Sequence, residues 1–324
     1  ITDNSGFAVD VDNHDSGNAT FSGNITSTGT GIRVQNCGGG AKTFSGSSKS
    51  ITTTTNTGVT LSSNSGATIN FTNGALVITT TSGTGFNATG GGTVTVQGTD
   101  NTISSGTGTA LNVSSTTIGV SGLTFQSISS NGSTKGIVLN ATGSGGLTVT
   151  GTGTTDGTGG TIQNVTTRGA EFISAQNITL KNMNFTNTPT LDFPAGPTGL
   201  SLGNNTADNA TIHLQTVTTT VIDNLNITGS AEQGINGHNV TGFSLSNSAL
   251  LNVGGGPDED GIHFYNMLGT CAITSTTITS SGDDNVNIQN ASGTSNITVT
   301  GGSFNTGVLG SGLLFGPRVS SNTT

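Results

Sequence analysis

The sequence predicts an all-β protein, a single-domain right-handed parallel β-helix that spans residues 1–324 as one solenoid of about 12 rungs. Three observations support this prediction. A short motif recurs at nearly constant spacing, apolar and polar residues alternate within each copy, and no segment has the periodicity of an amphipathic helix.

The recurring motif is a small residue followed by an apolar, an unrestricted and a second apolar residue. Its copies begin at Gly6, Gly31, Gly58, Gly85, Ala110, Gly136, Gly169, Gly199, Gly234, Gly261, Asn285 and Gly312. Neighbouring copies are 24 to 35 residues apart. The second position is apolar in every copy, and the fourth is apolar in all copies but one, where Gly237 stands. This alternation predicts strands that bury one face.

One such unit cannot bury its own apolar face, whereas stacked units can, with equivalent strands about 4.8 Å apart. Crossover chirality favours a right-handed coil. The longer units, around Thr150–Gln163, Asn187–Thr198 and Asn204–Asp223, predict loops on one flank. Neither end carries an amphipathic cap, so we expect an excerpt of a longer polypeptide, or ends that stack on neighbours.

Smaller features complete this picture. An asparagine stands five residues after the motif start at Asn36, Asn204, Asn239, Asn266 and Asn290. Asparagine tolerates the left-handed backbone of a tight turn, and its amide can bond to the same amide one rung away. Cys37 and Cys271 are about nine rungs apart by the ~27-residue period, too far for a disulfide, and are expected to be free thiols.

Composition limits the class of partner. The chain has 7 Lys and Arg against 16 Asp and Glu, with a formal net charge of −9. A nucleic-acid interface needs clustered basic residues, so nucleic acid is not expected as a partner. No apolar run approaches the roughly 20 residues of a membrane span. These features favour an extracellular or cell-surface protein.

Polar and charged side chains gather on consecutive rungs near the C-terminus. The candidate ligand-binding residues are Glu232, Asn236, His238, Asp258, Glu259, His263, Tyr265, Asn287 and Gln289. Alternation predicts that His263 and Tyr265 point outward. Amide, imidazole and phenol groups on a flat sheet suit sugar hydroxyls. Gly237 precedes His238, and its missing side chain either leaves room for a ligand or marks a tight bend.

The acids of these rungs are expected to lie close together at the surface. Crowded carboxylates raise at least one pKa and titrate as a coupled set. No cofactor is predicted and no metal is assigned, although hard oxygen ligands in a cluster suit Ca²⁺. A purely structural role as turn residues is the alternative for the acids. Further from the C-terminus, Arg168 and Glu171 are expected to form an exposed ion pair across one turn.

Two segments resemble a known enzyme family. "DGIH" from Asp260 and "GDDNVNI" from Gly282 resemble the polygalacturonase family, which are pectin-degrading β-helix hydrolases. The resemblance covers residues 258–316. It implies that Asp260, Asp283 and Asp284 are the acid and water-activating groups of an inverting glycoside hydrolysis. Two family motifs are missing: Ser311 stands where a histidine is expected, and no Arg-X-Lys segment follows.

The whole chain also resembles the Gly/Thr/Ser/Asn-rich β-helical tracts of large bacterial surface and secreted proteins, which are pectin-lyase-like in fold. "DNVNIQNASGTSNITVTGGSF" at 284–304 is typical of them. This resemblance implies a structural or adhesive segment that contacts carbohydrate through its C-terminal rungs. We therefore predict a non-enzymatic segment of this kind, with a polygalacturonase-like hydrolase of acidic polysaccharides as the alternative.

Overall fold

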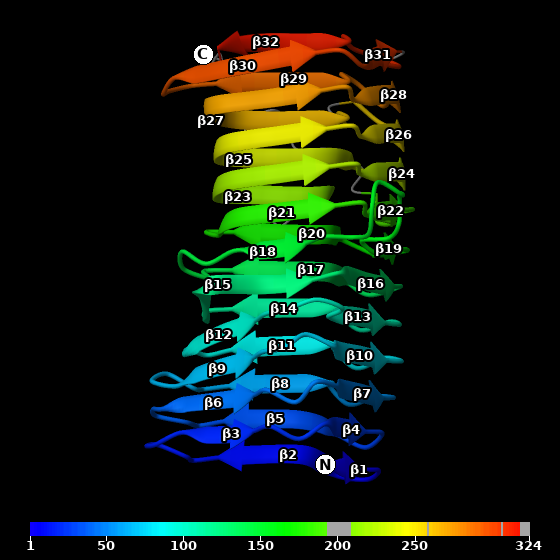
Figure 1. Cartoon of the computed structure of the whole chain (residues 1–324). Helices are drawn as coiled ribbons and strands as arrows, with labels where there is room; N and C mark the ends of the chain where they lie inside the picture. Colours follow the sequence, from blue (N-terminus) through cyan, green and yellow to red (C-terminus); the bar gives the residue numbers. More distant parts are fainter. Residues whose placement is uncertain (193–208, 258, 306, 318–324) are drawn as a thin grey trace.

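The computed structural model describes residues 1–192, 209–257, 259–305 and 307–317. It is an all-parallel β-solenoid of about 11 turns, which confirms the predicted right-handed parallel β-helix. Its strands are stacked along one axis, with β1 and β32 at opposite ends (Figure 1). Within the described ranges no helix occurs, and so none is long and apolar enough to cross a membrane.

Three faces surround the core. Face one consists of β2 (Phe7–Asp12), β5 (Gly31–Gln35), β8 (Val59–Ser62), β11 (Phe86–Thr89), β14 (Leu111–Ser114), β17 (Lys135–Asn140), β20 (Arg168–Ile173), β29 (Val286–Asn290) and β32 (Leu313–Pro317). Face two consists of β3 (Ala19–Phe21), β6 (Ala41–Phe44), β9 (Thr68–Phe71), β12 (Thr93–Val96), β15 (Thr117–Phe125), β18 (Leu147–Val149), β21 (Gln176–Lys181) and β30 (Ser295–Thr300).

Three long strands run through both of these faces: β23 (Ala210–Asp223), β25 (Gln233–Ser246) and β27 (Ile262–Thr274). Face three is a separate sheet of β1 (Thr2–Asp3), β4 (Ile25–Ser27), β7 (Lys49–Thr53), β10 (Leu76–Thr80), β13 (Thr102–Ser105), β16 (Ser127–Asn131), β19 (Thr161–Gln163), β22 (Asn184–Thr186), β24 (Asn226–Ser230), β26 (Ala249–Val253), β28 (Thr277–Ser281) and β31 (Ser303–Asn305).

The register confirms that the repeated motifs lie directly over one another. Ile235 pairs with Ile262, and Ile262 pairs with Val286. All three side chains are buried. Because each inward residue stacks on its equivalent, like side chains meet along the axis, as in the ring stack of Phe44 on Phe71 with centroids 4.7 Å apart.

One predicted rung was placed wrongly. The motif at Gly199 lies outside the described residues, and the strand that stacks between Ala170 and Ile235 contains Ile212. The sequence distance from Ala170 to Ile212 is 42 residues, and from Ile212 to Ile235 it is 23. Much of the predicted loop at 204–223 is therefore strand β23, and the extra length lies before Ala210.

Left-handed turns end many motif strands, as the asparagine pattern predicted, but Asn290 does not have the left-handed backbone. Asn36, Asn239 and Asn266 have φ values of 54°, 54° and 59°. The Asn266 side-chain amide donates a hydrogen bond to Asn239 Oδ1 at 2.8 Å, which confirms the expected contact between rungs. Asn204 lies outside the described residues, and Thr216, with φ 53°, occupies this corner in the rung of β23.

Two further expectations have different outcomes. Cys37 and Cys271 are free and buried, as expected. Gly237, however, leaves no room for a ligand, since a Cβ atom built at this position would clash with the Phe264 ring of the next rung. The missing side chain is therefore needed for packing inside the core.

Candidate functional site

Two columns of polar side chains run along the outer side of face one. The first column, here called the inner column, contains Glu171, His213, Asn236, His263 and Asn287, which pair rung by rung. The second, here called the outer column, contains Gln215, His238, Tyr265 and Gln289. The alignment brings together the predicted amide, imidazole and phenol groups.

The inner column is buried, contrary to the expectation that His263 is exposed. Asn236, His263 and Asn287 have exposed fractions of 1%, 3% and 7%. Alternation predicts that these side chains point away from the apolar core, but it does not predict what covers them. Side chains on rungs about 4.8 Å apart cover one another, and polar partners fill the remaining space.

Hydrogen bonds connect this column. Asn236 Nδ2 donates to Gln233 Oε1 at 2.9 Å, which leaves Asn236 Oδ1 as the acceptor for His213 Nδ1 at 2.6 Å. Burial, together with the nearby charge of Arg168, lowers the pKa of His213 to about 3. His213 is therefore neutral near pH 7, with its proton on Nδ1. Sequence reasoning missed His213 because it placed this rung at Gly199.

The outer column is the accessible part of the candidate site. Its side chains are only partly buried. The His238 and Tyr265 rings stack with their centroids 5.1 Å apart and their planes inclined by 18°. Gln289 Nε2 donates to Asn287 Oδ1 at 3.2 Å, which anchors the end of the outer column to the inner one.

Asp260, Asp283 and Asp284 form one acidic group, in which one oxygen atom of each residue lies within 4.8 Å of the others. Asp260 and Asp284 are buried rather than on the surface, and Asp283 is partly buried. Asp260 Oδ1 accepts a hydrogen bond from the Asp284 backbone N–H at 2.8 Å. Asp284 Oδ1 likewise accepts one from the Ser311 backbone. Each buried carboxylate thus holds the turn of the following rung.

The electrostatics of this group follow from its burial. Burial raises the pKa of Asp284, and the charges of Asp260 and Asp283 raise it further, against the lowering effect of the Ser311 hydrogen bond. The crowding of acids therefore contributes as expected, but burial is the larger cause. His263 Nδ1 lies 2.7 Å from Asp260 Oδ2, so this imidazole is the nearest group of opposite charge when it is protonated.

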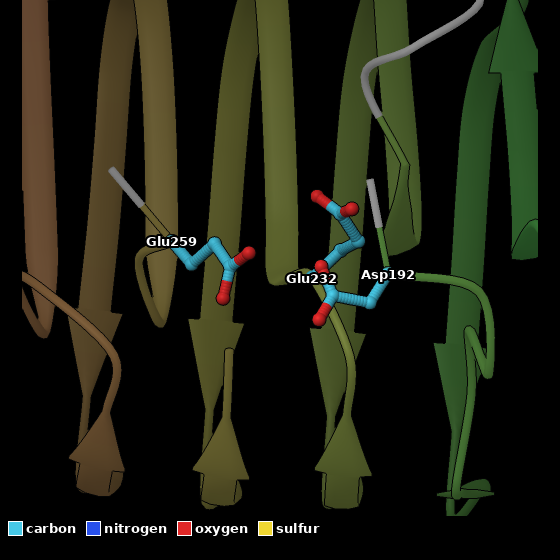
Figure 2. A group of neighbouring side chains, drawn as sticks. All are labelled: Asp192, Glu232 and Glu259. Carbon is cyan, nitrogen blue, oxygen red and sulfur yellow. The ribbon is translucent and has the colours of Figure 1, made fainter. Parts of the chain in front are cut away.

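A second acidic group lies nearby and contains Asp192, Glu232 and Glu259, again with one oxygen atom of each within 4.8 Å of the others. Figure 2 shows the three carboxylates, which come from separate segments of the chain. Glu232 and Glu259 are buried, whereas Asp192 is exposed. Glu259 Oε2 accepts a hydrogen bond from the Gly256 backbone at 2.5 Å.

The predicted acidic cluster is thus divided into two groups, and Asp258 lies outside the described residues. Sequence reasoning missed Asp192 because it belongs to the insertion between β22 and β23, where the repeat gives no register. Both groups offer only oxygen ligands, which is the donor set that Ca²⁺ prefers.

A buried ion cluster occupies the other end of the inner column. The Glu171 carboxylate accepts hydrogen bonds from Lys135 Nζ at 2.7 and 2.8 Å and from Arg168 Nη1 at 2.5 Å. Glu171 and Arg168 are 3% and 7% exposed, so the expectation of an exposed pair was wrong. Lys135 of the preceding rung was not predicted to take part.

No protein-family model, curated protein or solved structure matches this chain. The resemblance to polygalacturonases therefore depends on the two short segments around Asp260 and Asp283 alone.

Proposed function

We propose that this chain is an extracellular structural or adhesive segment of a bacterial surface or secreted protein, and that it contacts carbohydrate through its C-terminal rungs. The observation that carries the proposal is the outer column, in which an amide, an imidazole, a phenol and a second amide lie on four consecutive rungs. We propose on the same basis that the fold is pectin-lyase-like.

The chemistry of the outer column fits a polysaccharide that lies along the rod. Its groups donate and accept hydrogen bonds, as sugar hydroxyls do. The stacking of His238 on Tyr265 limits the motion of both rings, so little conformational entropy is lost on binding. The buried amide of Asn287 supports the end of the column by accepting the Gln289 hydrogen bond.

The acidic groups add a role for a cation. If Ca²⁺ binds at Asp192, Glu232 and Glu259 or at Asp260, Asp283 and Asp284, it neutralises repelling carboxylates that, apart from Asp192, lie just before the strands that carry the outer column. An acidic polysaccharide then meets less repulsion from this face. We propose Ca²⁺ as an aid to binding and not as a requirement for it.

Replacing Tyr265 with alanine tests the carbohydrate contact. Removing the ring and its hydroxyl, and with them the stacking partner of His238, is expected to weaken glycan binding at least about tenfold, or roughly 1.4 kcal/mol. A glycan array identifies the ligand, and titration with and without CaCl₂ then measures affinity. The control is Asn140→Ala, in the same column four rungs before Tyr265. Equal affinity of both variants and wild type would contradict the proposal.

Hydrolysis of acidic polysaccharide is the second candidate, favoured by the grouping of Asp260, Asp283 and Asp284. Two of these carboxylates are buried and hold backbone N–H groups, and Ser311 stands in place of the family histidine. We therefore expect no release of reducing ends from polygalacturonate. Release by the wild type that Asp283→Asn abolishes would instead establish the enzyme, since Asp283 is the most accessible acid of the three.

A further inference from the structure

A pocket of about 290 Å³ lies at the corner between faces two and three, away from the outer column. It is bounded on one side by the loop between β18 and β19, at Gly153 and Thr154. Lys181, Asn182 and Asp223, at the ends of β21 and β23, form another part of its lining. The loop is the lengthened unit that the sequence predicted at Thr150–Gln163.

Asparagine amides fix the geometry of this pocket. Asn182 and Asn224 stand on successive turns with φ 56° each. Asn224 Nδ2 donates to Asn182 Oδ1 at 2.7 Å and to the Thr154 carbonyl at 3.0 Å, while Asn182 Nδ2 donates to the Gly153 carbonyl at 3.1 Å. These bonds hold the loop over the corner, so the pocket is formed before any ligand arrives.

Two opposite charges lie beside each other in the lining. Lys181 and Asp223 are register neighbours on adjacent turns. Asp223 Oδ1 accepts hydrogen bonds from Ser246 Oγ at 2.8 Å and Asn247 Nδ2 at 2.9 Å. Burial raises the pKa of Asp223, but these two bonds and the charge of Lys181 outweigh burial and leave it lowered. The Asp223 carboxylate is therefore ionised near neutral pH.

Lys181 keeps its ammonium group available. The residue is exposed, and within the described part of the chain no carboxylate forms a salt bridge with it. The pocket thus offers one ammonium group, one fixed carboxylate and several amide and carbonyl groups, all at a preformed site.

We propose that this pocket binds a uronate unit of an acidic saccharide. The Lys181 ammonium pairs with the uronate carboxylate, while Asp223 accepts hydrogen bonds from sugar hydroxyls. A neutral sugar offers no charge for Lys181 to attract, and the two charges of a phosphate are repelled more strongly by Asp223 than the single charge of a uronate. This inference is independent of the outer column, because it uses different residues on a different side of the rod.

Titration with trigalacturonate and with its uncharged counterpart, galactotriose, tests the proposal. The wild type is expected to prefer trigalacturonate. Lys181→Gln is expected to weaken trigalacturonate binding about tenfold, equivalent to 1.4 kcal/mol, and to leave galactotriose binding unchanged. Asp223→Asn is expected to weaken the binding of both sugars, because it replaces the charged acceptor for hydroxyls with a neutral amide that accepts hydrogen bonds more weakly.

Asp12→Asn is the matched control. Asp12 also ends a strand before a left-handed asparagine and accepts hydrogen bonds from amides of the next rung, Gln35 and Asn36, but it does not line this pocket. The change at Asp12 should leave both affinities as they are. Circular dichroism confirms that each variant is folded, and the exposed Lys181 tolerates substitution in any case.

Three results would overturn the proposal. Wild type that fails to bind trigalacturonate excludes a uronate site. Equal affinities of wild type and Lys181→Gln exclude the pairing with the ammonium group. Trigalacturonate binding that Tyr265→Ala abolishes and Lys181→Gln does not alter assigns the uronate to the outer column instead, which keeps the two proposals distinguishable.

Discussion

Replacing Glu171 with glutamine is expected to lower the free energy of unfolding by about 3–5 kcal/mol. The change retains the shape of the side chain but removes the charge that Lys135 and Arg168 contact. Glu171 and Arg168 are buried, so water cannot compensate for the lost attraction as it would at the surface. Chemical denaturation of wild type and variant measures the difference.

An exposed ion pair provides the control for this prediction. Arg33 Nη2 lies 2.7 Å from Asp10 Oδ2, with 29% and 38% of the two side chains exposed. Surface pairs contribute roughly 0–1 kcal/mol, so Asp10→Asn should have little effect. Equal decreases in the free energy of unfolding for Glu171→Gln and Asp10→Asn would show that the buried cluster stabilises the fold no more than the exposed pair does.

The loss of stability in Glu171→Gln is expected to depend on pH. Burial raises the pKa of Glu171, but Lys135 and Arg168 outweigh burial and lower it from its usual 4.5. Because the folded-state pKa is the lower one, the stabilisation is complete above pH 4.5 and declines as pH falls toward the folded-state value. The difference in free energy of unfolding between wild type and Glu171→Gln should therefore become smaller as the pH falls below 4.5. A difference that becomes larger below pH 4.5 would contradict a lowered pKa of Glu171 in the folded protein.

Replacing Phe264 with alanine is expected to cost about 3–5 kcal/mol, because it removes a fully buried ring from the core. The ring packs against Phe243, with centroids 4.8 Å apart, and fills the space beside Gly237. Since His263 and Tyr265 flank Phe264 in the chain, glycan binding by the outer column should fall together with stability.

Combining Phe264→Ala with Gly237→Val tests whether these two residues compete for the same space. Gly237→Val alone is expected to destabilise by about 1–3 kcal/mol through overpacking against the Phe264 ring. In the Phe264→Ala background the new valine occupies part of the cavity, so the double variant should be more stable than the sum of the single changes indicates. Strict additivity of the two denaturation results would show that the residues do not compete for one space.

The repeat allowed most of the fold to be predicted, because one period determines both the strands and their neighbours. The positions of Ile235, Ile262 and Val286 illustrate this, since an interval of about 27 residues and apolar alternation suffice to stack them. The prediction failed at Ile212, where a long insertion interrupts the period and a chance motif at Gly199 fits the spacing better.

The candidate site was less predictable than the fold. Columns derived from the period correctly brought His263 beside Asn236 and Asn287. The burial of these side chains depends on how side chains of neighbouring rungs pack over them. The sequence pattern of a single rung does not predict this packing. Asp192 joins Glu232 and Glu259 from outside the repeat, so its place could be learned only from three-dimensional structure.

The stacking of turns along one axis also has a mechanical consequence. Each coil is held mainly by the coils directly above and below it, so tension applied along the rod should detach coils one after another from the ends. The long strands β23, β25 and β27, with the charged cluster beside them, are then expected to resist extension longest. A rod built in this way is expected to extend gradually, as successive coils unfold over a range of forces, and not to unfold in one step at a single force.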